Sequence, residues 1–444
     1  MLRRFAISCA LMVLAMPAPA RTRPHYGGVL RVETAGDPMV IARRLIYDGL
    51  TRIGADGSVQ PALATGWESD GDAHRWEFRL RPGVRFHDDS PLTSTAVVAS
   101  LNLSCNGGCP WSAVHAVGAT IVFTSDMATP NLPALLANDE FLIELVATAD
   151  GKTPGGAGAG PFRIDEIKDG ALKIVANDAC WQGRPFVDAI EIRGRRAVRD
   201  QWLDLSLDRV DVIDVPAEMI RQAQQQKLAT VISPPVDLLA LQVSESGALA
   251  NPLLRAAIAA SIDRSAIANV IFQRQGEATA SVLPQGLSGF SFLFPVERDL
   301  NKAHALRGGL AVPTLTLAAE GDGVMQLAAQ RIALDLREAG FNAVVASAAT
   351  GQQPDLLLRR IALQGGKPSA VLDEALHQMR EIPVGADPSP AAIYKVERTF
   401  LDQHTLIPLV SLPRAYAVGG RIRDLHLLAG GEPDLAGVSL EDAP

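Results

Sequence analysis

The sequence predicts an α/β fold with more than one domain, and three observations support this. Residues 314–346 are typical of a strand, a helix with one apolar face and a second strand. A unit of this size is expected for a right-handed crossover between parallel strands. Trp76–Leu80 alternates apolar with charged residues, which predicts a half-buried strand. The chain has 444 residues, too many for a single core.

The first residues predict export. Two arginines, Arg3 and Arg4, precede an uncharged run, Phe5–Met16, and Ala20 ends a small-residue pattern typical of signal peptidase sites. The run is about a dozen residues long, whereas a membrane-spanning helix needs about twenty. We therefore expect residues 1–20 to be a cleavable signal peptide and the mature protein to be periplasmic. Cys9 lies inside the run, which argues against a lipoprotein anchor.

Charge and glycine patterns exclude several other classes. The formal net charge is −8, and both signs are dispersed without a basic tract, which argues against nucleic acid as a partner. The glycine-rich segment 151–160 imitates two phosphate-binding motifs. Val146 stands where a P-loop needs its first glycine, and Pro161 stands where the dinucleotide motif needs its third. We interpret the segment as a return between domains and expect no cofactor.

Three cysteines remain after cleavage of the leader. Cys105 and Cys109 could form a local disulfide in an oxidising compartment and leave Cys180 free. The alternative is three isolated buried thiols. Two cysteines do not complete a tetrahedral zinc site, and no histidine lies at a ligand spacing nearby, so no metal site is predicted.

Catalytic motifs are not found in the sequence. Gly286–Phe290 resembles a nucleophile elbow, but Phe290 stands in place of its closing glycine. The histidines are scattered and form no zinc-protease pair. The sequence therefore predicts a protein that is not an enzyme, with a secreted α/β hydrolase as the remote alternative.

Several strings, in this order, resemble the family 5 solute-binding proteins of ABC transporters, the group that includes dipeptide-, oligopeptide- and nickel-binding proteins. They are Tyr47–Leu50, Pro61–Ala64, Trp76–Asp88, Gly158–Arg163, Asp208–Asp211 and Pro252–Ile267. The family usually has glycine at two positions where this chain has aspartate, Asp89 and Asp208.

The resemblance implies a two-lobed periplasmic-binding-protein fold of type II, with an extra domain inserted in lobe I. Lobe I would comprise 21–44, 160–235 and 410–444, the inserted domain 45–159, and lobe II 236–409. Two crossing strands near Val236 and Val410 would form the hinge. The resemblance further implies a monomer that closes over its ligand and delivers it to an inner-membrane permease. A degenerate sensor or scaffold is the alternative.

Two ligand-facing segments depart from the family pattern. The loop after the first strand is short, with only Gly36–Met39 before the helix. Relatives commonly have a tryptophan and an acidic Asp-Pro pair where this chain has Ile361–Pro368 without an acid. Such an acid commonly pairs with the amino terminus of a bound peptide. We therefore expect either a short peptide or a small polar solute of similar size.

Candidate ligand-binding residues come from both lobes. Asp37 follows the first strand at the carboxyl edge, where α/β lobes usually meet ligands. Phe290, Phe292 and Phe294 alternate, so an extended segment would place them on one face, either in the cleft wall or in the lobe II core. Trp67, Trp76 and Phe86 are expected in the core of the inserted domain. The candidates are Asp37, Pro38, Met39, Gly160, Trp181, Leu239, Leu241, Phe290, Phe292 and Gly365.

Overall fold

The structure is a computed structural model that describes residues 25–54, 56–104, 109–145, 156–321, 323–346, 353–363, 367–378 and 389–441. The expected signal peptide, Cys105 and Gly365 lie outside these ranges. Within them, no helix combines the length and the apolar character that crossing a membrane requires.

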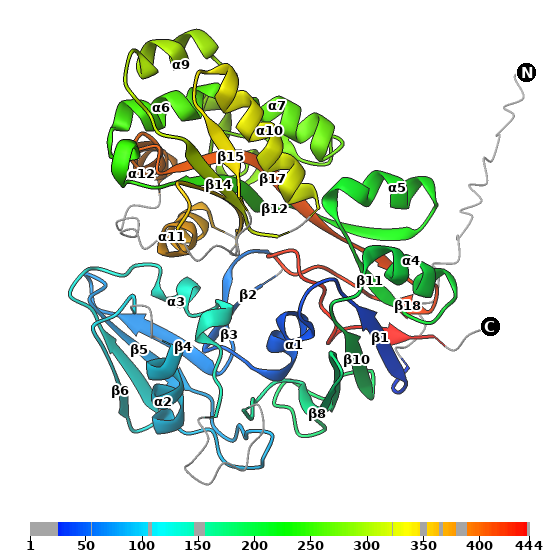
Figure 1. The fold of residues 1–444 in the computed structure, drawn as a ribbon. Helices are drawn as coiled ribbons and strands as arrows, with labels where there is room; N and C mark the ends of the chain where they lie inside the picture. Colours follow the sequence, from blue (N-terminus) through cyan, green and yellow to red (C-terminus); the bar gives the residue numbers. More distant parts are fainter. Residues whose placement is uncertain are drawn as a thin grey trace, which may run out of the picture.

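One large mixed sheet runs through both lobes (Figure 1). In spatial order its strands are β15 (Ala343–Val345), β14 (Leu315–Ala319), β16 (Leu356–Ala362), β12 (Ala229–Val243), β17 (Leu406–Val418), β11 (Val212–Val215), β1 (Val29–Glu33), β10 (Ala189–Arg193), β9 (Ala171–Ala176) and β8 (Phe162–Lys168), while β13 (Glu277–Ala278) pairs with β17. Lobe II carries β14–β16 and lobe I carries β1 and β8–β11, with the lobe names kept from the predicted limits.

The long strands β12 and β17 connect the two ends of this sheet. They pair antiparallel from Ala229 opposite Val418 to Gln242 opposite Leu406, and the register shifts on both sides of Pro235. Pro235 lies opposite Pro413. Proline has no N–H to donate to the ladder, so this is the point at which the paired strands are least tied to one another. The family resemblance implies a hinge near Val236 and Val410, close to this point, and both the hinge and the domain limits remain predictions.

Lobe II packs helices against its part of the sheet. They are α6 (Pro252–Ser261), α7 (Arg264–Ala266), η4 (Ile267–Ile271), α8 (Gln285–Ser288), η5 (Ser291–Leu293), α9 (Leu300–Arg307), α10 (Val324–Glu338), α11 (Pro368–Gln378) and α12 (Pro390–Leu401), with η3 (Gly247–Ala250) before α6. The predicted strand–helix–strand unit is confirmed as β14–α10–β15, because β14 and β15 pair in parallel. The α10 face that includes Ala328, Ile332 and Leu336 is buried in the core.

Lobe I carries α1 (Pro38–Ile46), α4 (Val198–Ser206), η2 (Ala217–Met219) and α5 (Ile220–Gln225), and the tail adds β18 (Ile422–Arg423) and β19 (Ser439–Leu440). Asp211, which ends one of the family-like strings, accepts hydrogen bonds from Arg31 on β1 and Arg421 in the tail. Asp208, in the same string, has a φ of 52°, in the left-handed region that favours glycine. Asp89 has a φ of 68°. Aspartate tolerates this region better than most residues, which explains how it replaces the glycine usual in the family.

The inserted domain has its own sheet and core. Its elements are β2 (Thr51–Ile53), β3 (Val59–Pro61), β4 (Ala64–Ser69), β5 (Arg75–Leu80), α2 (Ser94–Ser104), β6 (Ala113–Val117), β7 (Thr120–Thr124), α3 (Leu132–Leu135) and η1 (Asp139–Phe141). Trp76 and Phe86 are buried in this core, as predicted, and Trp67 packs against it while remaining partly exposed. Figure 1 shows this domain facing lobe II, with α3 opposite α11.

Candidate functional site

The inserted domain and lobe II touch through two polar contacts. The amide of Asn131, directly before α3, donates to the carboxylate of Asp373 on α11, and the amide of Asn138 donates to Glu374. Asp373 is 1 % exposed and Glu374 is 8 % exposed. Both carboxylates are therefore buried where the two domains meet. We call these four residues the closure contact.

A cavity of about 270 Å³ lies beside the closure contact. It takes residues from both sides: Ile53, Gly57, Ser58, Val59, Trp67, Trp76, Pro130, Asn131, Pro133 and Ala134 from the inserted domain, and Lys367 and Ala370 from lobe II. Trp76 satisfies its indole N–H by donating to the Thr129 carbonyl at 3.1 Å, so the part of its ring at the cavity is apolar. We call this space the interdomain cavity.

Lys367 is the single charged residue among the described residues that line the interdomain cavity. It directly precedes Pro368, the first residue of α11. The amino-terminal end of a helix carries a partial positive charge, and proline suits its first position because no N–H is needed there. The lysine and the helix end therefore both favour an anionic group here. This lysine lies in the segment where relatives commonly have an acidic Asp-Pro pair.

The crossing strands hold a network of charges that the sequence did not reveal. Arg414 on β17 donates to Asp237 on β12 with an Nη2–Oδ1 distance of 2.8 Å, and it also pairs with Glu432 in the tail. Asp237 is almost fully buried. Arg360 lies 4.0 Å from the same carboxylate. This network connects β12, β16, β17 and the tail.

A second polar cluster lies at the carboxyl end of β1 and β11. The Thr34 hydroxyl and the Ala35 amide both donate to Asp214. Burial raises the pKa of Asp214, although these hydrogen bonds act in the opposite direction. Polar groups at this edge of a parallel pair are expected from the general placement of ligand sites in α/β folds.

A larger cavity, of about 620 Å³, belongs to one half of the molecule. It lies among α1, the loop 182–186, the tail segment 428–437 and the β17 residues Arg414 and Tyr416, and none of the described residues that line it falls within 236–409. Asp48 at its wall accepts hydrogen bonds from Trp181 and Gln182. Burial nevertheless raises the pKa of Asp48 to about 6.

The three candidates at the start of α1 lie together on one turn. Asp37 is exposed, caps α1 by accepting from the Met39 amide at 2.9 Å, and lies 3.7 Å from Arg195. Pro38 is the first helical residue, and Met39 packs against the lobe I core. Asp37 thus has a local structural role, and a ligand role for these three residues stays a prediction.

Two lobe I candidates are engaged in packing. The Trp181 indole donates to Asp48 at 2.8 Å, and the Arg81 guanidinium lies over its ring at 4.3 Å. Gly160 is buried, and a Cβ at this position would come within 2.6 Å of the Leu45 carbonyl oxygen. Trp181 therefore fastens a lobe I loop to the inserted domain. Gly160 permits a close backbone approach to α1 rather than offering surface to a solute.

The lobe II candidates require correction. Leu239 and Leu241 are fully buried in the lobe II core, so they do not line a cleft. The extended interpretation of Phe290–Phe294 is also wrong, because Ser291–Leu293 forms the 3-10 turn η5. This turn directs Phe290 and Phe294 inward against Tyr394, whereas Phe292 is 71 % exposed. Gly365 lies outside the described residues.

The cysteines differ in state. Cys180 is free and buried, and burial raises the pKa of its thiol to about 11. Cys109 is disulfide-bonded, which excludes the interpretation of three isolated thiols. Its partner lies outside the described residues, so the pairing with Cys105 stays a prediction. Within the described ranges, no group of three or more His, Cys, Asp or Glu side chains is arranged to hold a metal ion.

Comparison of the sequence with known proteins identifies the family. The sequence model of the bacterial extracellular solute-binding proteins, family 5, matches residues 58–378. A probable di/tripeptide-binding protein from Pseudomonas aeruginosa is 24 % identical over 77 % of this chain and 75 % of its own length. The nickel-binding periplasmic protein of Escherichia coli is 24 % identical over 79 % of this chain and 71 % of its own length.

The fold comparison agrees. The structure of AgaA from Agrobacterium tumefaciens R10, in complex with agropinic acid, superimposes with a TM-score of 0.81 at 21 % identity, covering 94 % of this chain and 99 % of that one. The predicted type II periplasmic-binding-protein fold is thereby confirmed. The chain belongs to the bacterial extracellular solute-binding proteins of family 5 and serves as the substrate-binding component of an ABC importer.

Proposed function

We propose that the chain captures its solute in the interdomain cavity and closes the inserted domain and lobe II over it. The observation that carries this proposal is the lining itself, in which Trp67 and Trp76 face Lys367 and Ala370 across the two domains. A ligand that contacts both sides binds the closed form better than the open form, and therefore shifts the population toward closure. The inner-membrane permease then recognises the closed form and receives the solute from it.

The proposed ligand is a small solute with a carboxylate group, either a short peptide or an organic acid of similar size. The relatives differ in their named ligands, which are di- and tripeptides, nickel and agropinic acid. In this chain the cation of Lys367 suits a carboxylate, and the tryptophan faces suit an apolar body. The described lining offers no acid to a peptide ammonium group.

A thermal-shift screen followed by calorimetry tests the proposal. Carboxylate-bearing solutes should raise Tm, and Lys367→Ala should weaken the best of them by roughly tenfold or more, because a charge-assisted hydrogen bond is lost. Lys168→Ala, which alters an exposed lysine at the end of β8, is the matched control and should change nothing. The proposal fails if the tightest solute has no carboxylate, or if both variants bind it equally.

We further propose the finer properties that follow from the sequence: cleavage after Ala20, a monomeric periplasmic protein, no catalytic activity and no nucleic acid partner. The domain limits are proposed as 21–44, 160–235 and 410–444 for lobe I, 45–159 for the inserted domain and 236–409 for lobe II. An intact mass of the exported protein that begins at Arg21, together with a monomeric mass in light scattering, supports the first two. A retained leader or a stable dimer contradicts them.

A further inference from the structure

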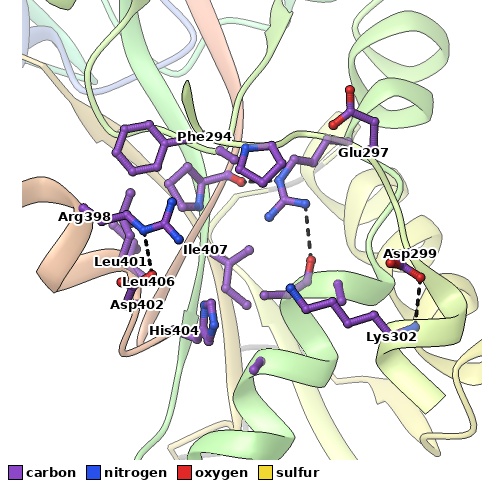
Figure 2. A pocket seen from close by; sticks show the side chains of 17 residues that line it. Phe294, Glu297, Asp299, Lys302, Arg398, Leu401, Asp402, His404, Leu406 and Ile407 are labelled. Carbon is purple, nitrogen blue, oxygen red and sulfur yellow. Dashed lines mark hydrogen bonds and ion pairs between the residues drawn. The ribbon is translucent and has the colours of Figure 1, made fainter. Parts of the chain in front are cut away.

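Lobe II contains a separate cavity that the proposed transport site does not use. It measures about 340 Å³ and lies among α6, α9, the end of α12 and the first residues of β17. Figure 2 shows Phe294, Glu297, Arg398, His404 and Lys302 around this space. Its apolar wall consists of Ala256, Ala259, Ala260, Ala280, Phe294, Leu401, Leu406 and Ile407. We call it the lobe II cavity.

Arg264 lines the lobe II cavity and is only 5 % exposed. Its Nε donates to the Pro408 carbonyl at 2.8 Å and its Nη1 donates to the Ala259 carbonyl at 3.3 Å. Among the described residues, Nη2 has no hydrogen-bond partner and no carboxylate forms an ion pair with Arg264. Burial lowers the pKa of Arg264 to about 10, so the side chain is still charged at neutral pH. A buried cation without a counter-ion is costly, and an anion in the cavity would offset that cost.

The other charged groups around the cavity are paired or, like the ammonium of Lys302, exposed to water. Asp299 accepts from the Lys302 backbone amide as the cap of α9, and Asp402 pairs with Arg398 at 2.9 Å. Burial lowers the pKa of His404, which keeps that ring neutral at pH 7. Glu297 is exposed at the cavity edge. Arg264 is therefore the buried charge that a ligand in this cavity would neutralise.

We propose that the lobe II cavity is a second ligand site, which binds a small carboxylate with an apolar body through Arg264. The carboxylate accepts from the Arg264 Nη2 donors, and the hydrocarbon part packs on Phe294, Leu406 and the α6 alanines. A small branched hydrocarbon suits the apolar wall and is smaller than the cavity volume of about 340 Å³. Because Arg264 bonds to Pro408, the bound carboxylate lies next to the first residues of β17. It therefore stabilises lobe II and does not bridge the two lobes.

Two probes with one carbon skeleton test this site by amide NMR titration of the full mature chain. Isovalerate carries the carboxylate, and 3-methylbutylamine carries an ammonium group instead. Isovalerate should shift the amides of Ala259, Ala260 and Ile407 and the Nε–H signal of Arg264 in a saturable way. The amine should leave these signals in place.

Two variants make the result specific. Ala256→Leu places a larger side chain in the lobe II cavity while keeping Arg264, and should weaken isovalerate binding roughly tenfold or more, because the added carbons occupy the space that the ligand needs. Lys367→Ala should leave these shifts unchanged, which separates the lobe II cavity from the interdomain cavity. The proposal is overturned if isovalerate shifts no signal of the lobe II cavity, if Ala256→Leu titrates like the unaltered protein, or if Lys367→Ala abolishes the shifts.

Discussion

The hinge and the closure contact join the same two halves by different chemistry. At the predicted hinge, Arg414 pairs with the buried carboxylate of Asp237, between two strands whose ladder has register shifts on both sides of Pro235. At the closure contact, neutral amides of Asn131 and Asn138 donate to Asp373 and Glu374 across separate elements with no shared strand. The predicted hinge therefore combines an ion pair with backbone pairing, whereas the closure contact consists of side-chain hydrogen bonds that water can replace.

The contrast indicates where a bound solute can change the conformation. Opening at the closure contact returns both carboxylates and both amides to water, so its net free energy is small. Removing one partner of the hinge ion pair leaves an uncompensated charge buried in the sheet. The free energy cost of this loss is large. Under the proposed mechanism, a solute in the interdomain cavity needs only modest differential binding to close the molecule, because the predicted hinge is unchanged between the two forms.

The largest expected effect comes from breaking the hinge network. Arg414→Ala leaves the buried Asp237 with Arg360, at 4.0 Å, as its one remaining ion-pair partner among the described residues. We expect the free energy of unfolding to fall by about 3–5 kcal/mol, since one partner of a buried pair is lost. Urea unfolding followed by circular dichroism measures it.

The control for this prediction is Arg423→Ala. Arg423 pairs with Glu441, but the two side chains are 45 % and 41 % exposed. Removing such an exposed pair should change the free energy of unfolding by less than about 1 kcal/mol. Equal losses in the two variants would contradict the contrast between buried and exposed pairs.

An intermediate effect is expected at the closure contact. The double variant Asn131→Ala/Asn138→Ala removes both donors and should shift the open–closed equilibrium by about 1–3 kcal/mol toward the open form. Small-angle scattering should then show a larger radius of gyration, while urea unfolding changes little. Asn342→Ala, which removes an exposed amide bonded to Thr314, is the matched control and should leave the radius unchanged. An unchanged radius in the double variant would show that other contacts hold the halves together.

The link between lobe I and the inserted domain should respond to pH. Burial raises the pKa of Asp48 to about 6 in the folded chain, above its ordinary value of 3.8. The folded protein then binds the proton more tightly than the unfolded chain, so this group's contribution to stability falls as pH rises from about 4 to about 6. Asp48→Asn removes the titration.

The measurement is the difference in the free energy of unfolding between the unaltered protein and Asp48→Asn, from pH 4 to pH 7. As pH rises across this window, the unaltered protein should lose stability relative to Asp48→Asn by on the order of 1 kcal/mol. Closure measured by scattering should not follow the same profile, because the Asp48 carboxylate bonds to Trp181 and Gln182, which take no part in the closure contact. A flat difference would show that the carboxylate stays ionised throughout.

The smallest effect is expected outside both regions. Asp208→Gly relieves a left-handed backbone and should change the free energy of unfolding by less than about 1 kcal/mol, since the gain is offset by a more flexible unfolded chain. Asp208→Ala should destabilise by about 1–2 kcal/mol, because Ala tolerates this conformation poorly. If Asp208→Ala proves the more stable variant, the backbone explanation is wrong.

The sequence predicts elements with a clear period better than it predicts the site. The unit β14–α10–β15 and the buried Trp76 follow from alternation and a helical apolar face, which depend on neighbours in the chain. The closure contact joins Asn131 to Asp373 over 242 residues, and no local pattern reports such a pairing. Arg414 and Asp237 look like surface charges in their strands, and only the fold buries them together.

The alternation of Phe290, Phe292 and Phe294 shows that a local pattern can also predict the wrong element. Every second residue faces one way in a strand, but a 3-10 turn of the same residues separates them, and the sequence does not decide between the two. The sequence shows that Ile361–Pro368 has no acid, but it does not single out Lys367, whose place in a cavity depends on the inserted domain. The local signal for that cavity was the pair Trp67 and Trp76, which the sequence assigns to a core.

A crystal structure of the protein with its co-purified solute, first identified by native mass spectrometry, tests the central claim most directly. The account predicts solute density between Trp67 or Trp76 and Lys367, with the Asn131–Asp373 contact formed. Density confined to the larger cavity beside Tyr47 and Arg414, with the interdomain cavity empty, would contradict it.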